Sequence, residues 1–161
     1  MIYSDILRRV KTVHQAKEIS YEIDMLVASL FKKESFHERL KTIRALTSED
    51  IINAMLENKI EISNHQAIKN FLVELISKIH SLKPFKIYLG FQPLETTIDK
   101  IFSWVSTNLG FGYVLDIEED KTIIGGAMVA FEGRYKDHSL KKSIERAFAN
   151  KKEEIVRVLN S

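Results

Sequence analysis

The residues best suited to chemistry in this sequence stand next to one another at Asp137, His138 and Ser139. They are the three residue types of a hydrolase triad, but triad side chains must face one another, and neighbours in sequence point in different directions. Asp and Ser are also preferred at the N-cap of a helix. We therefore expect Asp137 or Ser139 to cap a terminal helix, and an enzyme that uses this tripeptide ranks last among the possible functions.

The other reactive groups do not form a known motif. The five histidines are scattered, without the pair at helical spacing that a zinc site of the H-E-x-x-H type needs. Gly110-Phe111-Gly112 lacks the third glycine of a dinucleotide loop, and there is no Walker-type sequence. A solvated hairpin turn explains the acidic run at residues 118–120. We expect no catalytic residue, no metal ligand, no cofactor and no small-molecule substrate.

Composition narrows the function further. The chain has 161 residues, 24 basic and 22 acidic, and no cysteine. A net charge of +2 is too small for a nucleic-acid-binding footprint, and without cysteine there is neither a disulfide framework nor a thiolate metal site. Charged residues interrupt every apolar run before the roughly 20 residues that a membrane span requires. We expect a soluble protein of a reducing compartment, without direct insertion into a membrane.

Residues 1–83 show helical periodicity almost throughout. Apolar residues recur at spacings of three and four in five segments, which predicts about five helices packed as an antiparallel bundle. The expected helix starts are near Ser4, Val13, Phe36, Thr47 or Ser48, and Ser63.

Residues 84–161 predict a second, α+β domain with three to four short strands and a terminal helix. Strands are expected at residues 85–91, 113–117 and 127–131, with a fourth beginning at Tyr135. The run at 127–131 is apolar on both faces, so this strand should be central or covered on each side. A helix should begin at Pro93 and end at Gly110. Its buried face should contain Leu94, Ile98, Ile101, Phe102, Val105 and Leu109, with Trp104 off this stripe and partly exposed.

Two adjacent glycines, Gly125 and Gly126, stand between a charged turn and the apolar strand. Such a pair implies positive φ or close approach of another backbone segment. The spacing around it resembles the C-terminal part of the delta subunit of F-type ATP synthases, called the oligomycin sensitivity conferral protein in mitochondria. The residues that carry the resemblance are Asp120, Ile123, Ile124, Gly125, Gly126, Asp137 and Ser139. The chain departs from the family pattern at Glu132, Lys136 and His138.

This resemblance implies a non-catalytic subunit of the peripheral stalk, or stator, in a complex that couples ATP synthesis to proton transport. The subunit would be peripheral to the energy-transducing membrane, on its cytoplasmic side in a bacterium. Family partners are the N-terminal helices of the α-subunits, bound by the bundle, and the C-terminal ends of the b-subunits, bound by the C-terminal part. The alternative is a small cytosolic adaptor or regulatory protein with another partner.

Two sets of residues are candidates for those contacts. A groove for the catalytic head would involve Ile6, Leu7, Val10, Ile68, Phe71 and Leu72. Each of these could equally fill the bundle core, because apolar helix stripes are core by default. A stalk contact would involve Trp104, Ile155, Val158 and Leu159.

Overall fold

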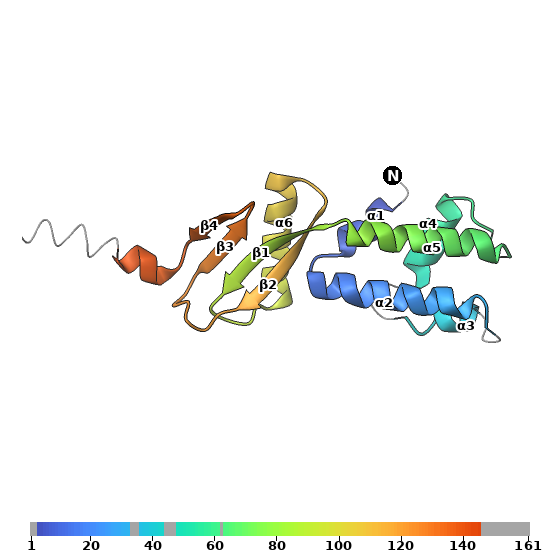
Figure 1. The fold of residues 1–161 in the computed structure, drawn as a ribbon, viewed down its shortest axis with the longest axis horizontal. Coiled ribbons are helices and arrows are strands. Elements are labelled where there is room, and N and C mark those ends of the chain that lie inside the picture. The colour runs from blue at the N-terminus through green and yellow to red at the C-terminus, as the bar shows by residue number, and fades with distance from the viewer. Residues whose placement is uncertain (1–2, 33–35, 44–47, 62, 146–161) are drawn as a thin grey trace, which may run out of the picture. The chain divides into compact units, whose positions relative to one another are not determined.

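The computed structural model describes residues 3–32, 36–43, 48–61 and 63–145 (Figure 1). The chain divides into two compact units. The first comprises Met1–Pro84 and Phe102–Val114, and the second comprises Phe85–Ile101 and Leu115–Ser161. The sequence predicted a boundary between two domains at residues 83 and 84. The division into compact units does not test whether such domains fold separately, so this boundary stays a prediction.

Helices build most of the first unit, as the periodicity predicted. They are α1 (Ser4–Arg9), α2 (Val13–Ser29), α3 (Phe36–Leu40), α4 (Ser48–Glu57) and α5 (His65–His80). The long helices α2 and α5 pack against each other (Figure 1). Their apolar stripes meet in a core that includes Ile23 and Leu26 of α2 and Leu72 and Leu75 of α5, all at most 1% exposed.

Side-chain caps determine where α2 and α5 begin. Thr12 and Gln15 form a capping box: the Gln15 amide donates to Thr12 Oγ1 at 3.1 Å, and the Thr12 amide donates to Gln15 Oε1 at 3.3 Å. Helix α5 begins at His65, close to the start expected near Ser63. Asn64 caps this helix, because its Oδ1 accepts a hydrogen bond from the Ala67 amide at 3.0 Å. Its amide oxygen serves the same purpose as a serine hydroxyl.

The rest of the chain is α+β, as predicted. It contains β1 (Lys83–Leu89), α6 (Glu95–Leu109), β2 (Tyr113–Glu119), β3 (Ala127–Phe131) and β4 (Arg134–Asp137). Residues 140–145 are helical and form the start of the expected terminal helix. Helix α6 ends before Gly110, whose φ of +86° suits glycine.

The strands form a mixed sheet in the order β2-β1-β3-β4. Strand β3 is antiparallel to both β1 and β4. Strands β1 and β2 run parallel, because hydrogen bonds join start to start, from Lys83 N to Gly112 O, and end to end, from Asp120 N to Leu89 O, each at 2.8 Å. The acidic run at residues 118–120, which includes the end of β2, is therefore not a hairpin turn, which corrects the sequence-based expectation. A hairpin would need β2 and β3 to be neighbours, and β1 lies between them.

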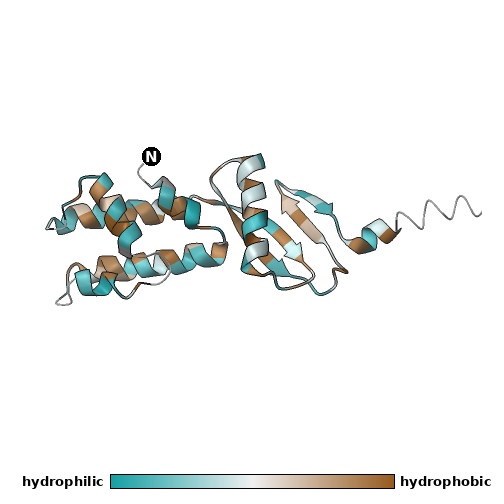
Figure 2. Ribbon diagram, turned by 180° about the vertical axis from the view of Figure 1, so that it is seen from behind, coloured by the Kyte–Doolittle hydropathy of each residue, from teal (hydrophilic) through white to brown (hydrophobic). Residues whose placement is uncertain are grey.

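Strand β3 has the central position that its apolar sequence predicted, although its residues are only half-buried. In Figure 2 its ribbon is apolar along its length, whereas that of β4 is hydrophilic. The expectation of a fully buried face on α6 is wrong. Leu94 precedes the helix and is 75% exposed, Val105 is buried, and the remaining residues of the stripe are half-buried. Trp104 is 57% exposed, as expected.

Candidate functional site

The glycine pair turns the chain tightly before β3. Gly125 and Gly126 have φ angles of +64° and +81°, which favour glycine. A Cβ atom on Gly126 would overlap the carbonyl oxygen of His138 and lie 3.0 Å from Ser139 Cα. Hydrogen bonds hold the two segments together, from Leu140 N to Gly125 O at 3.0 Å and from His138 N to Ala127 O at 2.9 Å. The pair thus lets the start of β3 lie directly against the start of the terminal helix.

The second half of the motif is a helix cap. Asp137 Oδ1 accepts a hydrogen bond from the Ser139 amide at 2.8 Å, and Ser139 Oγ accepts one from the Lys142 amide at 3.4 Å. The hydrogen bonds from Ser139 are the main reason why the pKa of Asp137 lies below its ordinary value. Ser139 is 4% exposed. Among the described contacts, no hydrogen bond joins the His138 side chain to either Asp137 or Ser139. This geometry caps a helix and does not form a proton relay.

Asp120 closes the turn that precedes the glycines. Its Oδ1 accepts hydrogen bonds from Thr122 Oγ1 at 2.6 Å and from the Thr122 amide at 2.9 Å, and these bonds lower the pKa of Asp120. Ile123 then points inward at 7% exposure, whereas Ile124 is 61% exposed. The motif residues therefore stabilise two turns, one before β3 and one after β4. Backbone hydrogen bonds join these two turns to each other.

Gly90 belongs to the same arrangement, although it lies outside the motif that carries the resemblance. A Cβ atom there would overlap the carbonyl oxygen of Ile123. The available signal was a lone glycine directly after a strand, which often marks a close approach of another backbone segment.

The residues predicted for a head-binding groove lie mostly inside the bundle. Ile6, Val10, Ile68, Phe71 and Leu72 are 0–4% exposed and belong to its core. Leu7 is half-buried. In this structure these side chains pack against one another, and their part in binding a partner stays a prediction. Of the predicted stalk contacts, Trp104 is exposed, whereas Ile155, Val158 and Leu159 lie outside the described residues.

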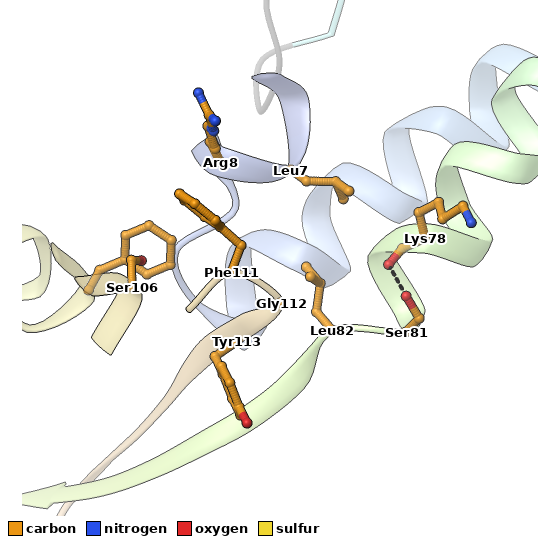
Figure 3. A pocket seen from close by; sticks show the side chains of 10 residues that line it. Leu7, Arg8, Lys78, Ser81, Leu82, Ser106, Phe111, Gly112 and Tyr113 are labelled. Atoms are coloured by element: carbon orange, nitrogen blue, oxygen red, sulfur yellow. Dashed lines mark hydrogen bonds between the residues drawn. The ribbon is translucent and has the colours of Figure 1, made fainter. Parts of the chain in front are cut away.

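A pocket of about 290 Å³ opens beside Leu7 (Figure 3). All its lining residues belong to the first unit: Leu7, Arg8, Lys78, Ser81, Leu82, Phe102, Ser106, Phe111, Gly112 and Tyr113. Phe111 is 73% exposed, and its ring centroid lies 5.0 Å from the Arg8 guanidinium carbon, a cation–π distance. The walls of the pocket are mostly apolar, and Arg8 and Lys78 lie among its lining residues. Such a pocket suits an apolar side chain of a binding partner that also has a carboxylate close by.

Two kinds of site are not found in the described part of the chain. Residues 3–32, 36–43, 48–61 and 63–145 contain no group of three or more His, Asp or Glu residues that could hold a metal ion. The same ranges contain no helix that is long and apolar enough to cross a membrane.

Comparison with known proteins supports the resemblance noted in the sequence. No protein-family model matches the chain. Two proteins named ATP synthase subunit delta, from Leptospira borgpetersenii serovar Hardjo-bovis strains JB197 and L550, are each 28% identical to it over 162 residues. Each alignment covers 89% of this chain and 83% of the relative. The similarity is therefore not confined to the glycine motif, and the chain is a distant relative of ATP synthase delta subunits, as the motif from Asp120 to Ser139 predicted.

Proposed function

We propose that this chain is a non-catalytic stator subunit of a rotary F-type ATP synthase. It would link the catalytic head to the b-subunits of the peripheral stalk and resist the torque of the rotor. The observation that carries the proposal is the similarity to delta subunits over 89% of the chain. The arrangement of a helical bundle followed by a small mixed sheet supports it.

In this role the bundle binds an N-terminal helix of an α-subunit. The pocket beside Leu7 provides a place for an apolar side chain of that helix, because an amphipathic helix binds a groove through apolar anchors at i, i+3, i+4 and i+7. Of the residues predicted for the groove, Leu7 lines this pocket, whereas Ile6, Val10, Ile68, Phe71 and Leu72 lie in the core of the bundle. The partner helix needs no rearrangement of these buried residues if Leu7 and Phe111 form its contact surface.

The C-terminal part binds the ends of the b-subunits. Trp104 supports this because an exposed tryptophan is a common interface hot spot. Ile155, Val158 and Leu159 are proposed as further contacts on the grounds of sequence alone. The protein would be peripheral on the cytoplasmic side of the energy-transducing membrane and would act in ATP synthesis and proton transport without a cofactor of its own.

Purification of the tagged full chain from its source under mild detergent tests the role. Recovery of α-, β- and b-subunits in stable proportion is expected. Depletion of the chain should leave ATP hydrolysis by the detached head intact and abolish ATP-driven proton pumping. Recovery with other partners and without any ATP synthase subunit would contradict the stator role and favour the adaptor alternative.

A narrower experiment tests the pocket. Phe111→Ala removes an exposed wall of the pocket without opening the core, and it should weaken binding of an α-subunit N-terminal peptide by about tenfold, as for an interface hot spot. Tyr21→Ala is the matched control, because Tyr21 is 67% exposed on α2 and does not line the pocket. Equal affinities for the two variants would exclude this pocket as the binding site.

A further inference from the structure

Strand β1 has one buried face and one more exposed face. Along β1, Phe85, Ile87 and Leu89 are buried at 4–6% exposure. The residues that alternate with them, Lys86 and Tyr88, are half-exposed on the opposite face. Successive side chains of a strand point to opposite sides, so the register of the sheet identifies which residues share the open side.

Cross-strand pairing extends this open face over the other strands. Ala130 lies opposite Lys86 and Met128 opposite Tyr88 on β3, and Tyr135 of β4 lies opposite Ala130. Ion pairs with Lys86 place two acidic residues of β2 on the same side. The open face is defined by Lys86, Tyr88, Asp116, Glu118, Met128, Ala130 and Tyr135, all in the second unit.

From β1 to the edge strand β4, the open face is aromatic and apolar. Tyr135 is 69% exposed, and its side chain shares a hydrogen bond with that of Tyr88. Partial burial, together with this bond, raises the pKa of Tyr88. Met128 and Ala130 lie between the two rings in the register and are half-buried. Tyrosine offers a large contact area at a low cost in side-chain entropy and is enriched among interface hot spots.

The β2 side of the open face is negatively charged. Lys86 Nζ lies 2.7 Å from Glu118 Oε1 and 3.9 Å from Asp116 Oδ2, so one ammonium serves two carboxylates. The side chains of Asp116 and Glu118 are 32% and 50% exposed and can accept a further cation. On β4, Asp137 pairs with Met128 of β3. The charges of Lys142 and His138 help to lower the pKa of the Asp137 carboxyl group. The excess of negative charge is therefore on the β2 side.

We propose that the open face docks an amphipathic helix of a partner protein whose apolar stripe is bordered by Lys or Arg. The apolar stripe would cover Met128 and Ala130, and Tyr135 on the edge strand β4 would anchor one side of the helix. A basic residue beside the stripe would pair with Glu118 and Asp116. Two carboxylates and one ammonium leave an excess of one negative charge on this side, which favours a basic partner over anionic lipids or nucleic acids. The proposal goes beyond the stator role, because neither the face nor the partner's chemistry depends on which complex contains the chain.

The probe is a synthetic peptide of about 18 residues, five helical turns, with Leu along one side bordered by Lys. A twin peptide has Glu in place of Lys. We expect the full chain to bind the Lys peptide more tightly than the Glu twin, in a salt-dependent manner. Tyr135→Ala should weaken binding of the Lys peptide by about tenfold. The matched control is Tyr21→Ala, since Tyr21 is 67% exposed and belongs to the first unit.

A second variant tests the charge separately from the aromatic anchor. Glu118→Gln keeps the shape of the side chain and should reduce both the affinity for the Lys peptide and its salt dependence. Equal binding by Tyr135→Ala and Tyr21→Ala, or equal affinity for the two peptides, would overturn the proposal. Because the probe is a free peptide, these outcomes are independent of whether the chain co-purifies with an ATP synthase.

Discussion

Gly126 meets two constraints at once, a positive φ and the close approach of another backbone segment. Alanine at a φ of +81° is strained, and its Cβ atom would overlap His138 O. Gly133 has a similar φ of +72°, but a Cβ atom there would have no heavy atom within 4 Å, so this position isolates the conformational cost. We expect Gly133→Ala to lower the free energy of unfolding by about 1 kcal/mol and Gly126→Ala by about 3 kcal/mol.

Chemical denaturation of the two variants measures this difference. Gly90→Ala provides the complementary case, since the overlap with Ile123 O occurs there without a positive φ. If Gly126→Ala and Gly133→Ala lost the same stability, the contact between the glycine pair and the terminal helix would have no energetic role.

Ser20 is a buried polar residue whose hydroxyl has no hydrogen-bond partner in the described part of the chain. A buried hydroxyl without a partner carries an uncompensated desolvation cost. Ser20→Ala should therefore raise the free energy of unfolding by about 1 kcal/mol. Ser29→Ala is the control, because the buried Ser29 hydroxyl donates to Leu26 O at 2.7 Å and its removal should bring no gain. A loss of stability in Ser20→Ala would show that the hydroxyl has a partner in solution.

At the scale of elements, the start of the terminal helix should respond to pH. Hydrogen bonds from Ser139 lower the pKa of Asp137. A carboxylate with a lowered folded-state pKa stabilises the fold above the ordinary Asp value of about 3.9, and this contribution is lost as the pH falls through the lower value. The difference in thermal unfolding midpoint between the wild type and Asp137→Asn should be largest near neutral pH and should close in acid.

A charge control accompanies that measurement. Asp24→Asn removes a negative charge from the exposed side of α2, away from any helix start. It should leave the pH dependence close to that of the wild type. An equal effect from Asp24→Asn would mean that overall charge, and not the cap at Asp137, controls the acid sensitivity.

At the scale of the molecule, the chain divides into two compact units. Leu72 is 0% exposed in the core of the first unit, and its replacement by alanine should lower the free energy of unfolding by about 2–5 kcal/mol. Amide hydrogen exchange should accelerate in α2 and α5 and remain unchanged in β3 and β4, whose hydrogen bonds belong to the second unit. Equal acceleration in both units would show that they unfold as one cooperative body.

Local patterns predicted most of the elements. Apolar spacing of three and four identified the helices of the first unit, and alternation identified strands close to their observed bounds. Errors arose where several local solutions have similar energies. Ser63 and Asn64 are both suited to begin α5, and in the folded backbone it is Asn64 Oδ1 that accepts from the Ala67 amide. The apolar stripe of α6 was visible in the sequence, but its degree of burial depends on what covers it.

The sequence by itself determined the types of element, the need for glycine at Gly125 and Gly126 and the family resemblance, because these depend on neighbouring residues and their spacing. Only the tertiary structure decided the position of β1 between β2 and β3 and the contact of Gly126 with His138. It also decided which side chains fill the core, such as Phe71, and which remain exposed, such as Tyr135. These outcomes depend on pairings between distant segments, whose energies no local pattern contains.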